Sequence, residues 1–226
     1  MIEFWKSWKL TPLEKSGVKS LKSGLKVVLK KVPKVVAVYA GGSFVRREMN
    51  AKSDVDVWVI TSDLRSQKIV EKLSFPMVGF SGYALQELKS GKQSAFRSRL
   101  MISPMRFVKY LPNFRLIYGK PLGKFPVRSD VEDLKALISV FRTKFLPLYA
   151  SGKFSFQSVL KQVFWLADLE LKLKGKHPPH SWKAIALMTG KDHIACLAWK
   201  LRGRHSSDRV KKLFIARLKK YLEGLC

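Results

Sequence analysis

The first long pattern along the chain is helical. Apolar residues recur every three or four positions between residues 18 and 32, and lysines occupy many of the positions between them. Thr11, Pro12 and Glu14 precede this run in the order typical of a helix start, as cap, first-turn proline and third-position acid. Pro33 ends the pattern. The sequence therefore predicts an amphipathic helix whose lysines face solvent.

Short apolar runs then predict strands that alternate with helices. Val35–Ala40 ends at two glycines and is typical of a strand buried on both faces. A Gly-Gly-Ser turn, a short helical segment and a loop separate it from a second predicted strand, which ends at Ile60. The pattern next predicts a helix over Leu64–Leu73, a strand over Phe75–Ser81 and a helix over Ala84–Ser90. A further helix around Phe96, Leu100, Met101 and Phe107 is expected to be interrupted by Pro104.

Beyond residue 129 the pattern is helical throughout. Ser129 is expected to cap a helix whose first turn carries three acids, the favourable sign for that end of the dipole. Short loops between amphipathic helices indicate an antiparallel bundle. The remaining predicted helices are Phe156–Leu173, Trp182–Met188, His193–Leu201 and Ser206–Leu222.

The residues with the clearest chemistry lie between the first two predicted strands. Gly41 and Gly42 let the main chain approach a bulky anion, and Ser43 begins a segment whose N–H groups can hold a phosphate. Asp54 and Asp56 flank Val55, so strand alternation points both carboxylates to one face. Two carboxylates this close repel unless a cation lies between them. The stretch thus indicates a phosphate cradle beside a magnesium site.

The same stretch resembles a known signature. The block Gly42-Ser43-Phe44-Val45-Arg46, then Glu48, then Ser53-Asp54-Val55-Asp56 resembles the minimal nucleotidyltransferases of the DNA polymerase beta superfamily. Position 47, here arginine, is usually glycine in that pattern. The resemblance implies that two Mg²⁺ ions bind Asp54 and Asp56, and that a nucleoside triphosphate is the substrate. The residues implied to bind this nucleotide are Gly41, Gly42, Ser43, Arg46 and Ser53.

One carboxylate of the family pattern has no counterpart in this chain. The superfamily normally carries a third acid on a later strand, and the predicted strand Phe75–Ser81 contains none. Glu87 and Glu48 are the substitutes proposed from the sequence, and Glu71 is another neighbour. Either such an acid takes the role, or the chain binds a nucleotide without efficient transfer.

The resemblance also implies a division into domains. Residues 115–122 resemble the closing segment of minimal nucleotidyltransferases, which places the end of the catalytic domain at Leu122. The expected fold is an α/β (α+β) domain with a mixed sheet over residues 1–122, then an all-α helical bundle over residues 123–226. The passage Leu171–Met188 loosely resembles the HEPN-type or substrate-binding bundle that often accompanies such domains.

The charge of the chain indicates the kind of partner. Lys and Arg number 44 against 16 Asp and Glu, for a net charge of +28. Such a one-sided excess favours a polyanion, and nucleic acid, RNA or tRNA above all, is the expected partner. No apolar run approaches the roughly 20 residues that span a bilayer, so no membrane partner is expected. Two cysteines and an amino terminus unlike a signal peptide favour the cytoplasm.

A second set of residues has the spacing of a zinc site. His177 and His180 are followed twelve residues later by His193 and Cys196. The alternative is a solvated loop followed by a half-buried helix.

The sequence therefore predicts a Mg²⁺-dependent enzyme that moves a nucleoside monophosphate from a nucleoside triphosphate to a hydroxyl, preferably on RNA or tRNA. One alternative is a catalytically weak or inactive transferase fold that acts as a nucleic-acid-binding module. Another is a toxin–antitoxin-type transferase that modifies tRNA or a protein.

Overall fold

The computed structural model describes residues 1–51, 53–94 and 103–225 of the chain. The chain divides into two compact units, Met1–Val127 and Arg128–Cys226, and each has its own hydrophobic core. The predicted boundary after Leu122 falls in the segment that joins the last strand of the first unit to the first helix of the second.

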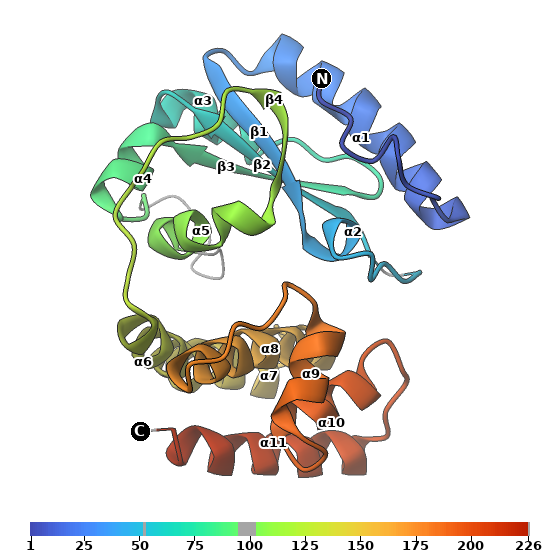
Figure 1. The fold of residues 1–226 in the computed structure, drawn as a ribbon, viewed down its shortest axis with the longest axis vertical. Coiled ribbons are helices and arrows are strands. Elements are labelled where there is room, and N and C mark those ends of the chain that lie inside the picture. The colour runs from blue at the N-terminus through green and yellow to red at the C-terminus, as the bar shows by residue number, and fades with distance from the viewer. Residues whose placement is uncertain (52, 95–102, 226) are drawn as a thin grey trace. The chain divides into compact units, whose positions relative to one another are not determined.

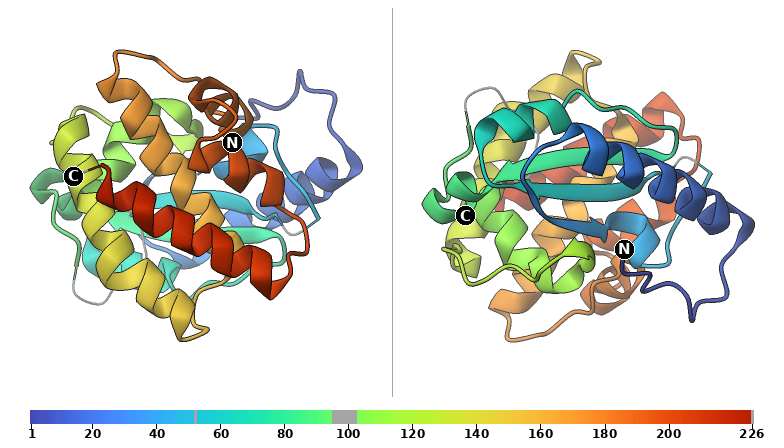
Figure 2. Two further views of the ribbon diagram at one scale, coloured as in Figure 1. Left: turned by 90° about the horizontal axis from the view of Figure 1, so that it is seen from below. Right: turned by 90° about the horizontal axis from the view of Figure 1, so that it is seen from above.

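Helix α1 (Pro12–Lys31) covers one face of the sheet in the first unit (Figure 2). It begins as the sequence predicts, because Glu14 N–H donates to Thr11 Oγ1 over 3.2 Å and Thr11 N–H donates to Glu14 Oε2 over 2.8 Å. Its inner face includes Gly17 and Gly24. A Cβ atom on Gly24 would lie 2.9 Å from the Phe80 ring, so the missing side chain lets the helix approach the sheet closely.

The sheet of the first unit is mixed, as predicted, and has the strand order β3-β2-β1-β4 (Figure 1). Strand β1 pairs antiparallel with both β2 and β4, whereas β2 and β3 are parallel. The strands are β1 (Val35–Gly41), β2 (Val55–Thr61), β3 (Val78–Ala84) and β4 (Arg115–Gly119). The helices that follow α1 in this unit are α2 (Gly42–Val45), α3 (Leu64–Val70), α4 (Leu85–Ser90) and α5 (Pro104–Tyr110), with a 3₁₀ turn at Leu111–Asn113.

Two local predictions were wrong. Strand β3 begins at Val78 rather than Phe75, because Pro76 has no N–H group to donate and Met77 has a positive φ of 59°. Phe75 lies before the strand, and its ring packs edge-on against Phe80, with centroids 5.4 Å apart. This packing explains the apolar residue at that position. Pro104 begins helix α5 instead of interrupting one, with Ser103 as its cap. The predicted helical positions Phe96, Leu100 and Met101 lie outside the described residues.

Aromatic side chains gather on the sheet face opposite α1. Trp58 of β2 stacks on Phe114, with ring centroids 4.2 Å apart, and Tyr83 of β3 stacks on Phe107 of α5 at 4.5 Å. Phe107 also lies 5.6 Å from Phe114, which joins the two pairs into one cluster. This face is also the one that carries Asp56, because Asp56 and Trp58 are two residues apart on β2.

The second unit consists of helices, and all but α7 lie where the sequence predicts them. A π-helical segment, Phe141–Phe145, joins α6 to α7. The helices are α6 (Asp130–Val140), α7 (Leu146–Ala150), α8 (Phe156–Leu173), α9 (Trp182–Thr189), α10 (Ile194–Leu201) and α11 (Asp208–Glu223). Among the described residues of the whole chain, no helix is both long and apolar enough to span a membrane.

Candidate nucleotide and metal site

The turn after β1 is shaped around one aspartate. Gly41, the last residue of β1, pairs across the sheet with Asp56 of β2. Gly42 follows with a φ of +64°, in the left-handed region that favours glycine. A Cβ atom on Gly42 would lie 1.6 Å from Asp56 Oδ2. The Asp56 carboxylate is therefore in direct contact with the main chain of the turn, a position that only glycine leaves open.

The second aspartate, Asp54, lies at the same end of strand β2. Asp56 pairs with Gly79 of the parallel strand β3, so a side chain at Gly79 would point to the face that carries Asp56. A Cβ atom built there would lie 3.0 Å from Asp54 Oδ2. Both carboxylates thus occupy one face, Asp56 on the side of β1 and Asp54 on the side of β3. An ion that both aspartates bind would have to lie between these positions.

Solvent reaches the aspartates more readily than it reaches the turn. Asp54 is exposed and Asp56 is half-buried, whereas Ser43 is 8% exposed and both glycines before it are buried. Ser43 accepts a hydrogen bond at its carbonyl from Glu48 N–H, over 2.8 Å. Ser53, just before Asp54, holds the loop, because its hydroxyl accepts from Asn50 N–H over 3.0 Å. The direct contacts of Ser43 and Ser53 with a nucleotide stay predictions.

The positive charge of Arg46 is paired within the site. Arg46 Nε lies 3.1 Å from Glu48 Oε2, and the two side chains are 4% and 8% exposed. A buried carboxylate that already pairs with an arginine is not free to bind a metal ion, which does not favour Glu48 as the missing acid. Arg46 remains close to the turn in sequence, and its contact with a phosphate stays a prediction.

The structure does not bring Glu87, a candidate for the missing third acid, to the two aspartates. The carboxylate is buried and accepts hydrogen bonds from Gln67 Nε2 at 2.7 Å, from Ala84 N–H at 3.2 Å and from Ser94 N–H at 2.7 Å. Glu87 comes after Ala84, the last residue of β3. Ala84 is five residues beyond Gly79, the partner of Asp56, which corresponds to about 17 Å along an extended strand. Glu87 therefore stabilises the start of α4 at the far end of β3. Glu71 also has a structural contact, since its Oε1 accepts from Gly82 N–H over 2.9 Å.

The predicted zinc site is wrong. Among the described residues, no three His, Cys, Asp or Glu side chains come together in a way that could hold a metal ion. His193 instead caps α10, accepting from Ala195 N–H at Nδ1 over 3.1 Å, and its Nε2 lies 2.9 Å from Glu170 Oε2. His177 is exposed, His180 is half-buried near the Trp165 ring, and Cys196 is half-buried on α10. The spacing of the four residues reflects a loop followed by a capped helix.

Sequence reasoning missed the role of Arg47. This residue occupies the position that is usually glycine in the family pattern, and its φ is +59°. Its guanidinium bonds to both carboxylate oxygens of Glu14, at 2.7 and 3.1 Å, and donates to the Lys9 carbonyl over 2.8 Å. It also lies 4.7 Å from the centre of the Trp8 ring. The signal in the sequence was a bulky residue where the backbone favours glycine.

Arg47 thereby connects the amino-terminal segment to the turn. Phe4, Trp5 and Trp8 all pack around Phe44, the residue after Ser43, with ring centroids 5.7 to 6.0 Å away. Burial alone would raise the pKa of Glu14, but the bonds from Thr11 N–H and the Arg47 guanidinium lower that pKa below its usual value. Glu14 is thus held ionised. Its ion pair with Arg47 stabilises the aromatic side chains that pack against the turn at Phe44.

Comparisons with known proteins bear on the family and the fold. Residues 21–110 match the family described as "Nucleotidyltransferase domain". No curated protein sequence matches the chain. Among solved structures, a protein from Sulfolobus solfataricus described as a nucleotidyltransferase aligns over 36% of this chain and 81% of its own. That alignment has 19% identity and a TM-score of 0.29, too low to bear on the fold.

A second solved structure is similar over nearly the whole chain. Spectinomycin adenyltransferase from Enterococcus faecialis, in complex with ATP and spectinomycin, aligns over 92% of this chain and 99% of its own. The identity is 16% and the TM-score is 0.50, so the likeness concerns the fold alone. The likeness extends over both units. The chain therefore carries a nucleotidyltransferase domain, which is followed by a helical region.

Proposed function

We propose that the chain transfers a nucleoside monophosphate from a nucleoside triphosphate to a hydroxyl, with Asp54 and Asp56 as the metal ligands. The observation that carries this proposal is the contact between the Asp56 carboxylate and the left-handed main chain at Gly42. This contact supports the proposal, because it brings the turn expected to bind phosphate next to a carboxylate expected to bind the metal. Asp54, on the same face, supplies the second carboxylate.

The residues present fit Mg²⁺. This ion prefers oxygen ligands and commonly takes one or two carboxylates, with substrate phosphates and water completing its shell. Asp54 and Asp56 supply such a pair. When bound, the metal would neutralise phosphate charge and favour departure of pyrophosphate. The main chain of the Gly42–Ser43 turn would orient the phosphates, and the two aspartates would fix the metal relative to them.

The acceptor that we favour is a hydroxyl of RNA or tRNA. The similar solved structure holds ATP and spectinomycin, so this fold also accommodates a small-molecule acceptor. The net charge of +28 favours a polyanion for the present chain, because a cationic surface raises the local concentration of such a partner.

The test is incubation of the protein with each of the four α-labelled nucleoside triphosphates and Mg²⁺. Total cellular RNA, purified tRNA, mixed protein and spectinomycin serve as separate acceptors. We expect label on RNA or tRNA that disappears when the metal is chelated. Label on spectinomycin or protein instead of RNA would overturn the proposal that RNA or tRNA is the acceptor. No label on any acceptor would overturn the proposal that the chain is a transferase.

A second candidate function is nucleic-acid binding without efficient transfer. The observation that favours it lies on β3, where Gly79 and Ser81 occupy the face of Asp56 and neither is an acid. A site without a carboxylate base would deprotonate the acceptor hydroxyl slowly. This function predicts RNA binding that weakens steeply with salt and no metal-dependent labelling.

A further inference from the structure

Five lysines form a single row along α1. Lys15, Lys19, Lys22, Lys26 and Lys30 are spaced by four, three, four and four residues, which keeps them on one side of an α-helix. With a rise of 1.5 Å per residue, the row is about 22 Å long and advances about 5.6 Å from one lysine to the next. This step is similar to the distance between successive phosphates of an extended nucleic-acid strand.

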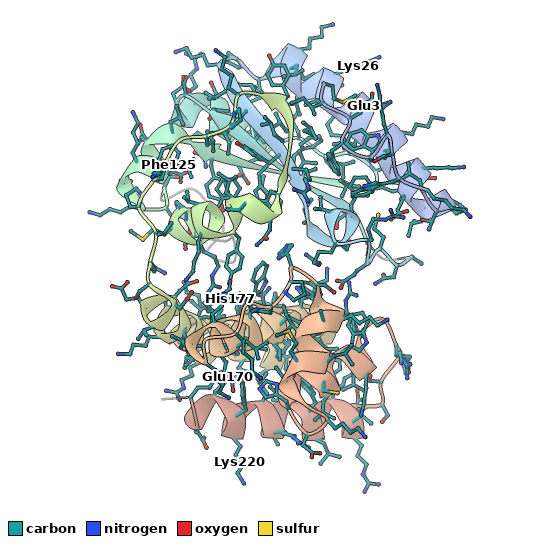
Figure 3. The ribbon with its side chains drawn as sticks, in the orientation of Figure 1. Glu3, Lys26, Phe125, Glu170, His177 and Lys220 are labelled. Atoms are coloured by element: carbon teal, nitrogen blue, oxygen red, sulfur yellow. The ribbon has the colours of Figure 1, made fainter. Side chains whose placement is uncertain are left out.

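The charge of this lysine row is largely uncompensated. Lys15, Lys19, Lys26 and Lys30 are exposed, and within the described part of the chain none of them makes an ion pair. Figure 3 shows Lys26 on the outer side of α1. Lys22 pairs with Glu3 over 2.8 Å. Glu14, the acid in α1, is turned inward to Arg47. Neighbouring lysines at this spacing repel each other, so the row costs helix stability that packing must offset.

Hydroxyl groups lie beside the lysine row. Ser16, Ser20 and Ser23 repeat at the same helical spacing on the adjoining side of α1, and the first and last of them are exposed. A serine hydroxyl donates readily to a phosphate oxygen. The outer surface of α1 therefore presents cations and neutral donors in two parallel rows.

The lysine row begins next to the candidate site. Glu14 precedes Lys15 and is bonded to Arg47, four residues after Ser43. A Cβ atom on Gly17 would lie 3.0 Å from Val55, the residue between the two aspartates. The lysine row thus begins at the end of α1 that packs against the start of β2, and the aspartates lie at that start on the opposite face of the sheet. The other end of the row leads away along α1.

We propose that the lysine row binds the backbone phosphates of a single-stranded nucleic acid whose terminal hydroxyl lies near Asp54 and Asp56. A single file of cations matches one strand, with about one phosphate per lysine, and it contacts no base, so binding is independent of sequence. The placement of the terminal hydroxyl rests on the proposed function, whereas the phosphate contacts do not.

The test compares two variants of the full chain without any nucleotide present. Lys19, Lys26 and Lys30 are changed together to Gln, and binding to a labelled single-stranded homopolymeric RNA is measured by anisotropy over a range of salt concentrations. Each phosphate contact to a single strand contributes about 0.7 to the slope of log K against log salt, so the slope should fall by about 2. The affinity at low salt should fall about tenfold or more.

The control makes the same change of charge elsewhere. Lys212, Lys219 and Lys220 are exposed on α11, and Figure 3 labels the last of them. Their joint change to Gln should leave the salt slope close to that of the wild type. Equal losses in both variants, or no loss in the α1 variant, would overturn the proposal. So would a loss of binding to anionic phosphatidylserine vesicles with RNA binding unchanged.

The proposed function and this inference fail separately. If RNA binding depends on the lysine row but no nucleotide is transferred, only the transferase proposal fails. If transfer to RNA occurs and the α1 variant binds and labels RNA like the wild type, only the proposed role of the lysine row fails.

Discussion

A single glycine explains why the turn and the metal ligands can lie together. The Asp56 carboxylate occupies the place where any other residue at position 42 would put its Cβ atom. Gly42→Ala should therefore displace Asp56 and abolish nucleotide transfer. The left-handed φ adds a cost of about 1–2 kcal/mol in the free energy of unfolding. The measurements are transfer of labelled nucleotide and urea unfolding.

Gly123→Ala is the matched control for this substitution. A Cβ atom there meets no heavy atom within 4 Å, so both activity and stability should stay near the wild type. Normal transfer by the Gly42 variant would show that the contact between Asp56 and the turn is not needed.

Arg47 affects the stability of the fold in two opposite ways. Arg47→Gly would relieve a left-handed conformation, worth about 1 kcal/mol, but would leave the Glu14 carboxylate buried without its partner. Loss of one partner from a fully buried ion pair costs about 3–5 kcal/mol. The Arg47 side chain is 38% exposed, which lowers that cost, so the variant should be less stable by about 1–2 kcal/mol.

The same variant should also release the amino-terminal segment. Trp8 loses the guanidinium over its ring, so tryptophan emission should shift to the red and proteolysis before residue 12 should quicken. Arg47→Lys keeps the charge without the planar fork and should be intermediate. A glycine variant as stable as the wild type would contradict this account of Arg47.

At the scale of elements, helices were predicted better than strands, because their start signals are local. Thr11, Ser129 and Ser155 each accept a hydrogen bond from a main-chain N–H three residues on, as caps do. The start of β3 was misplaced because the apolar run around Phe75 lies in a turn, where Phe75 and Met77 are half-buried. Burial and strand pairing leave the same apolar signal in sequence.

The candidate site was predictable only where its residues are close in sequence. Gly42 and Asp56 belong to one short block, and the structure brings them into contact. Glu87 was chosen for its nearness in sequence to the predicted strand, and register alone reveals that it lies at the other end of β3. The bond between Arg47 and Glu14 crosses 33 positions and leaves no periodic signal.

The missing acid on β3 is a feature that can be restored. Ser81 lies on the face of Asp56, two residues beyond Gly79, and is half-buried. Ser81→Asp should add a carboxylate near the pair and raise the transfer rate, on the order of 10²-fold if deprotonation of the acceptor limits it. Single-turnover transfer checks the rate. Ser90→Asp, on α4, is the control. No gain from Ser81→Asp would indicate that the missing acid does not limit the reaction.

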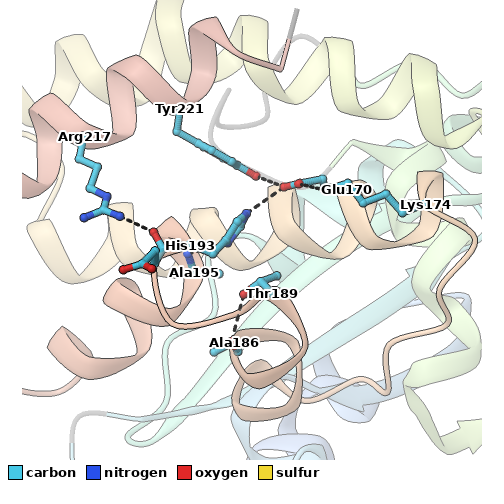
Figure 4. A network of polar contacts seen from close by, with 9 residues as sticks. Glu170, Lys174, Ala186, Thr189, His193, Ala195, Arg217 and Tyr221 are labelled. Carbon is cyan, nitrogen blue, oxygen red and sulfur yellow. Dashed lines mark hydrogen bonds and ion pairs between the residues drawn. The ribbon is translucent and has the colours of Figure 1, made fainter.

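A polar network stabilises the second unit (Figure 4). Glu170 of α8 lies 2.9 Å from His193 Nε2 and accepts from Tyr221 of α11 over 2.5 Å. The bond to His193 is the main cause that lowers the pKa of Glu170 from 4.5 to about 2. Burial and the Glu170 carboxylate raise the pKa of Tyr221, so this phenol stays a donor.

This network predicts a pH dependence with a definite sign. Because the pKa of Glu170 is lower in the folded state, its stabilisation is complete above about pH 4.5 and is lost as the pH falls toward 2. The wild type should exceed Glu170→Gln in free energy of unfolding by on the order of 1–2 kcal/mol at pH 6, allowing for solvent screening, and the gap should fall to roughly half of that at pH 3. Urea unfolding at both pH values measures the gap. A gap that does not change with pH would contradict the assignment.

At the scale of the whole molecule, the chain joins a nucleotidyltransferase domain to a helical region and carries a net charge of +28. Its acids are few, and several hold structure: Glu14 binds Arg47, Glu48 binds Arg46 and Glu170 binds His193. Asp54, just before β2, is exposed, and its side chain makes no ion pair with the described residues. An acid left unpaired in so basic a protein is well placed to bind a cation.

The most direct test compares three single variants in one labelling assay with Mg²⁺, labelled nucleotide and RNA. Asp54→Asn and Asp56→Asn should each lower transfer at least 10³-fold while circular dichroism stays unchanged, since both carboxylates are needed for the metal. Asp208→Asn, which removes an exposed acid at the start of α11, should transfer normally. Transfer at the wild-type rate by either variant of the pair would contradict the account.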